Sequence, residues 1–345
     1  MTDVTHDIVE GLGRLAIVGV AKNCGKTTTL NHLLNATAED RNIGLVSVGL
    51  DGESADLLIG TDKPRIVARR GTHLVTTDGA LGESTARVEY VEALGIATPL
   101  GEVVVARVLD PGSILLAGLR HRADLQRAGR ALEAHGCELV FIDGAYGRTV
   151  AARPDVAEAA VVSTGAVLSS DIDQIVARTT AFIERLALEP TDVAWQTELI
   201  ERAVGHKRCL LGGPAVAPRP LCARSALIGL AEADGVWSDE SVRAVAIPGL
   251  VSDGVVEHLL AAPPHVSTLL VPDGTVLKAR ADLLLRLRDH FEVRALSSIE
   301  IRAISVNPTG PRGRRVDRDA LIERLANRWP STPVVDPLFG SPLAP

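Results

Sequence analysis

The chain has 345 residues, 46% of them hydrophobic and 23% charged, which is typical of a soluble globular protein long enough for two domains. Its formal net charge of -7 argues against a general nucleic-acid binder, since such domains are usually basic. No basic segment followed by a long apolar stretch opens the sequence, and no uncharged run is long enough to cross a bilayer, so we expect a cytoplasmic protein without a membrane partner.

The first elements in chain order form a junction between a strand and a helix. The apolar run LAIVGVA at 15–21 predicts a buried strand, and KTTTLNHLLNAT at 26–37 predicts the helix that follows it. A second strand is expected over about 43–50, where NIGLVSVGLDGES leads into Asp51. Since aromatic residues make up only 3%, the core must be built mainly from Ala, Val, Leu and Ile, which favours a parallel sheet covered by helices.

The stretch 60–119 has a different pattern. PRIVARRGTHLVTT and GEVVVARVLDPGSILLAGL are short Val-rich runs separated by Gly or Pro, and no long helix is predicted between them. Residues 82–95 are compatible with one helix or helical turn. We expect an antiparallel β insertion within the first domain, because strands joined without long crossovers pair as hairpins.

The alternation of helices and strands returns after this insertion. A helix is predicted over 122–136, where Gly136 ends the pattern, and an apolar strand over 138–148 leads into Asp143. Another strand is predicted over 159–166 and a helix over 169–188, which begins with serine and acidic residues, as helix N-termini prefer.

A segment rich in Gly and Pro around 189–220 interrupts the pattern. Beyond it, strands are predicted in SALIGLA, VRAVAIPG, STLLVPDG, FEVRALS and IRAISVNP, with helices in VSDGVVEHLLAA and KARADLLLRLRDHF. We therefore expect an α/β fold with a first domain at 1–190 and a C-terminal α/β domain at 220–345. One single larger domain is the alternative.

The junction GVAKNCGKTTTL is close to a phosphate-binding loop, whose pattern is G-x-x-x-x-G-K-[ST]. Gly25, Lys26 and Thr27 fit the end of that pattern, but its first glycine falls on Val20, and the nearest glycine is Gly19. A plain strand–turn–helix junction is the alternative. A lysine in the first helical turn opposes the helix dipole, and a bound phosphate removes that conflict. We therefore predict a P-loop NTPase-like parallel sheet in the first domain.

This prediction assigns a role to each residue type at the junction. Lys26 would reach the terminal phosphates, and the Thr27 hydroxyl would bind Mg²⁺. A metal-side carboxylate belongs at the end of another strand, where Asp143 is the first choice and Asp51 the second. The catalytic residues would be Lys26 and Asp143. The predicted nucleotide contacts are Lys22, Asn23, Cys24, Gly25, Lys26, Thr27 and Thr28. Since the chain has no N-K-x-D element of the kind that reads guanine, ATP is favoured over GTP.

Several sequence blocks together resemble a known family. GVAKNCGKTTTLNHLL, SVGLDGE, ATPLGEVVVARVLDPGSILLAG, FIDGAYGR, VVSTGAVLS and ISVNPTGPRG occur in this order over most of the chain. With them the chain resembles the P-loop ATP-binding reactivase subunit associated with adenosylcobalamin-dependent lysine 5,6-aminomutase and ornithine aminomutase. The resemblance implies an ATP-driven chaperone that helps to exchange damaged cobalamin on the mutase, with the 60–119 insertion and the C-terminal half facing the partner. The chain has no D-x-H-x-x-G element, so it should not hold cobalamin firmly itself.

The function expected from the sequence is a nucleoside triphosphatase that uses ATP and Mg²⁺ to drive a step on a partner protein. That partner would be a cobalamin-dependent aminomutase or a second reactivase subunit, and formation of a homo-oligomer is left open. One alternative is a small-molecule kinase or ligase of the dethiobiotin-synthetase type. Another is a nucleotide-binding adaptor with little turnover.

Overall fold

The structure is a computed structural model that describes residues 4–37, 40–51, 65–117, 119–144, 149–231 and 237–339. The chain forms two compact units, one made of Met1–Ile183 with Ile299–Pro345 and the other of Glu184–Ser298. This division differs from the predicted 1–190 and 220–345. The reason is strand β17 (Glu300–Asn307), which follows the second unit in sequence but pairs in parallel with β11 (Ala159–Gly165) of the first.

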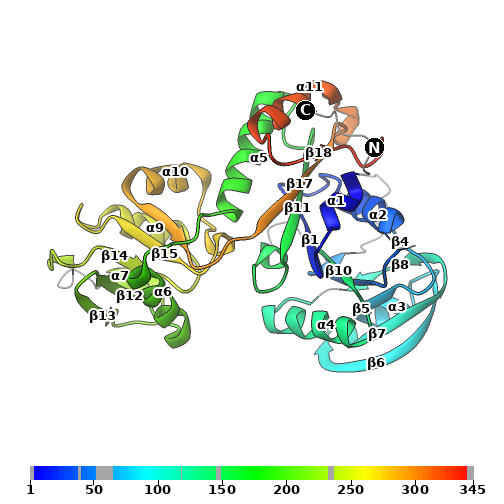
Figure 1. The fold of residues 1–345 in the computed structure, drawn as a ribbon, viewed down its shortest axis with the longest axis horizontal. Helices are drawn as coiled ribbons and strands as arrows, with labels where there is room; N and C mark the ends of the chain where they lie inside the picture. The colour runs from blue at the N-terminus through cyan, green and yellow to red at the C-terminus, as the bar shows by residue number, and fades with distance from the viewer. Residues whose placement is uncertain are drawn as a thin grey trace. The chain divides into compact units, whose positions relative to one another are not determined.

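The first unit is built on a sheet that has nine strands among the described residues, in the order β18-β17-β11-β1-β10-β2-β5-β7-β6 (Figure 1). From β18 to β5 all neighbouring strands are parallel, and β7 and β6 extend the sheet in antiparallel fashion. The bounds of the strands not yet given are β1 Arg14–Gly19, β2 Ile43–Ser47, β5 His73–Thr77, β6 Arg87–Thr98, β7 Gly101–Asp110, β10 Leu139–Asp143 and β18 Val334–Val335. The α/β fold class with a largely parallel sheet is therefore confirmed.

The described part of the 60–119 stretch contains the expected antiparallel pairs. β6 and β7 form a hairpin, β4 (Ile66–Ala68) pairs with β8 (Gly112–Ile114), and β3 (Leu50–Asp51) pairs with β9 (Leu116–Ala117). The helix or helical turn predicted over 82–95 is wrong, because β6 occupies most of that range. Val88, Val91 and Leu94 recur at every third position, as on one face of a helix, but pairing with β7 decides the conformation.

Two helices cover opposite faces of the central strands. α2 (Lys26–Thr37) buries Leu30, Leu33 and Leu34 in the same apolar core as Leu45 of β2. On the other face, a Cβ added at Gly44 would lie 3.0 Å from Leu132 Cδ1 of α4 (Arg122–Ala134). Alternate residues of β2 thus face α2 and α4, as the pleat of a strand requires. The other helices of this unit are α1 Val4–Val9, α3 Asp78–Leu81, α5 Ile172–Leu186, which reaches into the second unit, and α11 Arg318–Arg328.

The second unit has its own sheet, with five strands among the described residues, in the order β13-β12-β14-β15-β16. β14, β15 and β16 are parallel, and β12 and β13 are antiparallel. The strands are β12 Leu210–Gly213, β13 Val216–Pro220, β14 Ala244–Ala246, β15 Thr268–Val271 and β16 Glu292–Ala295, and the helices are α6 Ala194–His206, α7 Ala226–Ala231, α9 Asp253–Leu260 and α10 Ala281–His290.

Two sequence-based expectations for the second unit are wrong. The interruption expected at 189–220 contains α6, whose Leu199, Ile200 and Ala203 are buried in a core with β12 and β14. The predicted strand SALIGLA forms α7 instead. Across the described residues, no helix combines the length and the apolar character that a membrane crossing needs.

Candidate functional site

The junction between β1 and α2 lies where the sequence predicted it. β1 ends at Gly19, and α2 begins at Lys26. Between them, Asn23 has a φ of 61° and Gly25 a φ of 99°. Glycine adopts such positive φ values without steric cost, and asparagine tolerates them better than most residues. The segment therefore has the kind of backbone that makes anion-binding concavities in proteins.

Gly19 explains the departure from the phosphate-loop pattern at Val20. A Cβ added at Gly19 would lie 2.4 Å from Cys24 Sγ, 3.1 Å from the Ala21 carbonyl oxygen and 3.1 Å from Lys26 Cγ. Position 19 is therefore the one that must be glycine, because later residues of the loop pack directly against it. From Gly19 to Gly25 the loop is one residue longer than the pattern. The Val20 N–H donates to the Ser163 carbonyl oxygen at 3.0 Å, which ties the start of the loop to β11.

The side chains predicted to touch phosphate differ in their exposure. Lys22 is exposed, Lys26, Thr27 and Thr28 are half-buried, and Cys24 is fully buried. The first turn of α2 contains no acidic residue that would favour the positive end of the helix. Its hydrogen bonding begins with the Thr29 N–H, which donates to the Gly25 carbonyl oxygen at 2.9 Å. The N–H groups just before Thr29 belong to the Gly-Lys-Thr-Thr segment. Because the first N–H groups of a helix have no acceptor within the helix, these groups can donate to a ligand.

A cluster of buried hydroxyl groups holds this turn of α2 against the sheet. Thr29 Oγ1 donates to the Gly25 carbonyl oxygen at 3.0 Å and lies 2.6 Å from Ser305 Oγ and 3.3 Å from Ser163 Oγ. Because Thr29 has a single hydroxyl hydrogen, the serine hydroxyls donate to it. These three residues are not among the predicted site residues. The available signal was the serine near the end of each otherwise apolar run, VVSTG and AISVN.

Asn307 at the end of β17 is a further residue that the sequence analysis did not assign to the site. A Cβ added at Gly25 would lie 3.3 Å from Asn307 Cβ, so this asparagine borders the loop directly. Its Oδ1 accepts a hydrogen bond from the Thr309 N–H at 3.0 Å, and its carbonyl oxygen accepts one from the Ala166 N–H at 2.9 Å. The loop is thus supported by a strand that lies far away in sequence.

Asp143 lies on the strand next to the loop, as predicted. It ends β10, which runs between β1 and β2, and it pairs with Ile17 on one side and with Ser47 on the other. Its exposure is 0%, and its carbonyl oxygen accepts a hydrogen bond from the Val48 N–H at 2.8 Å. Its carboxylate therefore lies inside the fold, on the strand next to the loop and at the carboxyl edge of the sheet.

Asp51 does not end the second strand, because β2 stops at Ser47. Asp51 lies in β3 and pairs with Leu116 of β9. The side chain of Asp51 lies outside the described part of the structure, so its predicted role at the metal stays a prediction.

The side chains predicted to bind magnesium at Thr27 and Asp143 are both oxygen donors. Within the described residues, no group of three or more His, Cys, Asp or Glu side chains is arranged to hold a metal ion. That finding is compatible with Mg²⁺, which is commonly held by one or two protein oxygens together with phosphates and water. The donor set therefore fits this ion better than a transition metal, which would prefer histidine or cysteine.

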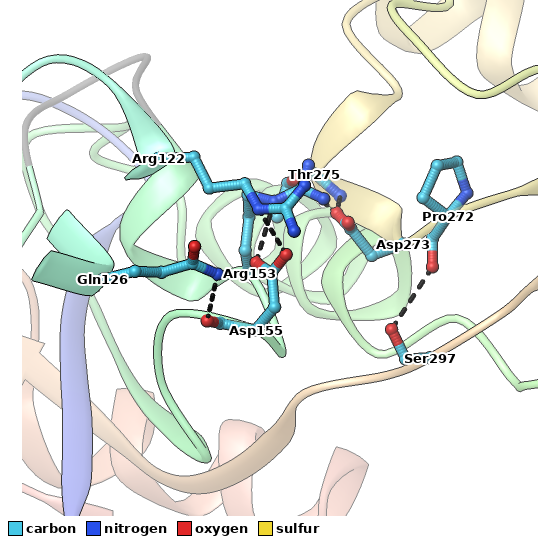
Figure 2. Close-up of polar contacts among 8 residues, drawn as sticks. All are labelled: Arg122, Gln126, Arg153, Asp155, Pro272, Asp273, Thr275 and Ser297. Carbon is cyan, nitrogen blue, oxygen red and sulfur yellow. Dashed lines mark hydrogen bonds and ion pairs between the residues drawn. The ribbon is translucent and has the colours of Figure 1, made fainter. Parts of the chain in front are cut away.

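Figure 2 shows further polar contacts, each of which joins residues of the same unit. In the first unit, Arg122 Nε lies 2.5 Å from Asp155 Oδ2 and Arg153 Nε lies 3.1 Å from Asp155 Oδ1, while the Gln126 side chain donates to the Asp155 carbonyl oxygen at 2.9 Å. Two guanidinium groups thus share one carboxylate beside the start of α4.

In the second unit, the turn after β15 carries a buried carboxylate. Asp273 accepts hydrogen bonds from the Thr275 N–H, at 2.9 Å, and from its hydroxyl, and Ser297 Oγ donates to the Pro272 carbonyl oxygen at 3.4 Å (Figure 2). Burial lowers the pKa of nearby Lys278 to about 8, and the positive charge of Arg185 adds to this effect while Asp273 opposes it.

Comparisons with known proteins give two structural neighbours. No model of a protein family matches the chain, and no curated protein matches it. The MinC:MinD cell division protein complex of Aquifex aeolicus is 14% identical over 50% of this chain and 63% of that chain, with a TM-score of 0.28. A structure of pnob8 ParA is 14% identical over 52% of this chain and 61% of that chain, with a TM-score of 0.27. The chain thus spans about three-fifths of the length of the structures it matches.

Proposed function

We propose that this protein is a P-loop nucleoside triphosphatase that binds ATP with Mg²⁺ between the 19–28 loop and Asp143. The observation that supports this most strongly is the backbone of the loop. It leaves a buried parallel strand, closes tightly over Gly19, passes through positive φ at Asn23 and Gly25, and opens a helix with Lys26. A plain strand–turn–helix junction needs neither the close packing at Gly19 nor a lysine at the helix start.

Each side chain would act through charge and position. Lys26 would neutralise the terminal phosphates, with Lys22 as a second cation, while the amides of the loop and of Thr28 donate to phosphate oxygens. Cys24 is fully buried, so we assign only a backbone contact to it. The Thr27 hydroxyl and the Asp143 carboxylate would hold magnesium, which supplies charge neutralisation when bound. The catalytic contribution of this chain is then electrostatic stabilisation as water attacks the terminal phosphoryl group.

We further propose that hydrolysis drives a chaperone step on a partner protein in the cytoplasm. The partner class comes from the sequence blocks that resemble the reactivase subunit of cobalamin-dependent aminomutases. The partner-facing surfaces would be the β6–β7 hairpin region of the first unit and the exposed surface of the second.

The test is calorimetric binding of ATP and GTP, with and without Mg²⁺, to the parent protein and to Lys26→Ala. We expect the variant to keep its fold but to lose about 10- to 100-fold in affinity, because a charge-assisted contact to phosphate is lost. The matched control is Lys207→Gly, which removes a positive charge at a left-handed position at the end of α6 and should leave binding unchanged.

The outcomes separate the candidate functions. Phosphate release that rises only with a protein partner would support the chaperone, whereas release that rises with a metabolite would point to a kinase or ligase. Tight binding without turnover would point to an adaptor. If neither nucleotide binds at millimolar concentration, or if Lys26→Ala binds as the parent does, the proposal is wrong.

A further inference from the structure

The sheet face that α2 covers is apolar except near the carboxyl ends of the strands. There the last row of side chains, meaning side chains of register partners on neighbouring strands, contains polar residues. Phe141 of β10 and Leu45 of β2 belong to the same buried core as Leu33 of α2. Side chains alternate along a strand, so the next residues on this face are Asp143 and Ser47. These two are register partners, so they lie side by side beneath the start of α2 at the carboxyl edge of the sheet.

Ser47 has an unusual environment for a serine. Its exposure is 0%, and among the described residues its Oγ has no hydrogen-bond partner. A hydroxyl group that is removed from water without a partner loses its hydrogen bonds to solvent and gains nothing in return. Most buried side-chain polar atoms in proteins do have a partner, so the Ser47 hydroxyl needs an explanation.

The hydroxyl on the next strand of this row is satisfied by the protein itself. Thr76, on the neighbouring strand β5, donates to the Leu115 carbonyl oxygen at 3.0 Å and accepts from the Ala117 N–H at 2.8 Å. On β11 and β17, two residues further along and level with Gly19, the hydroxyls of Ser163 and Ser305 contact Thr29. Ser47 lies between these satisfied groups and next to Asp143, which indicates that its partner is a ligand rather than part of the fold.

A water molecule between Ser47 and Asp143 fits this position. Neighbouring strands lie about 4.8 Å apart, so one water can reach the side chains of two register partners. Magnesium gives up its waters reluctantly and usually keeps several of them when it is bound by a carboxylate. We infer that the Ser47 hydroxyl is a positioning group that holds a water of the magnesium hydration shell beside Asp143. This inference rests on the proposed nucleotide and magnesium site.

The inference makes opposite predictions for the free and the loaded protein. In the free protein, Ser47→Ala removes a polar group that has no partner, so thermal stability should stay the same or rise. With nucleotide present, the variant lacks the hydrogen bond to the ion's water, so the factor by which Mg²⁺ improves nucleotide affinity should fall about 10-fold. If Ser47 had only a structural role, its substitution would lower the stability of the free protein. The magnesium factor, which is the ratio of nucleotide affinity with Mg²⁺ to that without it, would then stay unchanged.

The experiment measures binding of a non-hydrolysable ATP analogue by calorimetry in excess Mg²⁺ and in EDTA. The parent, Ser47→Ala and Ser47→Cys are compared, and the melting temperature of each free protein is recorded. The cysteine side chain has the same shape as serine, is slightly larger and hydrogen-bonds only weakly, so it preserves the test if the alanine variant does not fold. The control is Thr180→Val on α5, where another buried hydroxyl oxygen has no partner among the described residues. Its magnesium factor should equal that of the parent.

The results separate this inference from the proposed function. A reduced magnesium factor in both Ser47 variants, with affinity in EDTA and melting temperature preserved, supports the inference. If the parent binds the analogue and both variants keep the full magnesium factor, or if their free forms melt earlier, the inference is wrong while the nucleotide site stands. If the parent does not bind the analogue at all, the proposed function is wrong and the inference fails with it.

Discussion

Replacing Gly19 by alanine should damage the loop, whereas replacing Val20 should not. A Cβ at position 19 would lie 2.4 Å from Cys24 Sγ, closer than non-bonded atoms can approach, and the nearby Ala21 oxygen belongs to the backbone. Overpacking of this kind costs about 1–3 kcal/mol. In a domain of this size, that cost corresponds to a fall of about 2–12 °C in melting temperature. The loop would also shift, so nucleotide affinity should fall more than stability does.

The assay combines thermal unfolding with nucleotide binding for Gly19→Ala and Val20→Ala. A matched control is Gly82→Ala in the same unit, where the added Cβ meets only the Gly79 carbonyl oxygen at an ordinary 3.5 Å. The double variant Gly19→Ala with Cys24→Ala should recover part of the lost stability, because the sulfur that the new methyl meets is removed. If Gly19→Ala melts and binds nucleotide as the parent does, the assignment of the required glycine to position 19 is refuted. If Val20→Ala is the more damaging change, the close approach at Gly19 does not govern the shape of the loop.

Two further predictions concern buried polar groups of the first unit. Burial lowers the pKa of His73, and the positive charges of His135 and Arg107 add to this effect, so the unfolded chain binds the proton more readily than the folded one. Stability should therefore fall as pH drops below about 6.5, and urea unfolding of His73→Gln should show a smaller loss between pH 7.5 and 5.5, roughly the window in which histidine titrates; equal losses would contradict this. Thr29→Val removes the hydroxyl that joins Gly25 to Ser305 and should cost about 1–3 kcal/mol in denaturant unfolding. Thr29→Ser should retain most of that stability, and equal destabilisation by both changes would show that the methyl group matters instead.

The sequence predicted the loop well because the signals for it are local. The buried run of β1, the Gly-Lys-Thr order and the helix over 26–37 are all set within about twenty residues, and α2 has the predicted bounds. The position of Asp143 was predicted from a local signal as well, because it ends an apolar run. Counting residues failed at one point, since the pattern placed the glycine at Val20. The residue that must be glycine is the one whose Cβ would clash with other atoms of the loop. That depends on distances between atoms in the folded loop, which the number of residues between two positions in the sequence does not give.

The parts that the sequence did not predict depend on pairing between distant segments. The range 82–95 has helix-like spacing, yet it forms β6 because β7 offers a partner strand over most of its length. The run IRAISVNP was correctly expected to be a strand, but nothing in its own residues indicates which sheet it joins. The Thr29–Ser163–Ser305 cluster is likewise invisible in the sequence, because its members are 134 and 276 residues apart from Thr29 along the chain.

The position of β17 in the chain has a consequence for how the site is completed. This strand brings Ser305 to the hydroxyl of Thr29 and Asn307 to the backbone of Gly25, so both the first turn of α2 and the loop itself are supported by it. In sequence, however, β17 comes only after the whole second unit. A fragment that ended near residue 190 would contain every residue of the phosphate-loop motif, but β11 would lack its neighbour along the edge that β17 occupies, and Thr29 would lose its shortest hydrogen bond. The motif is therefore local in sequence, while the structure that holds it in shape requires the chain on both sides of the second unit.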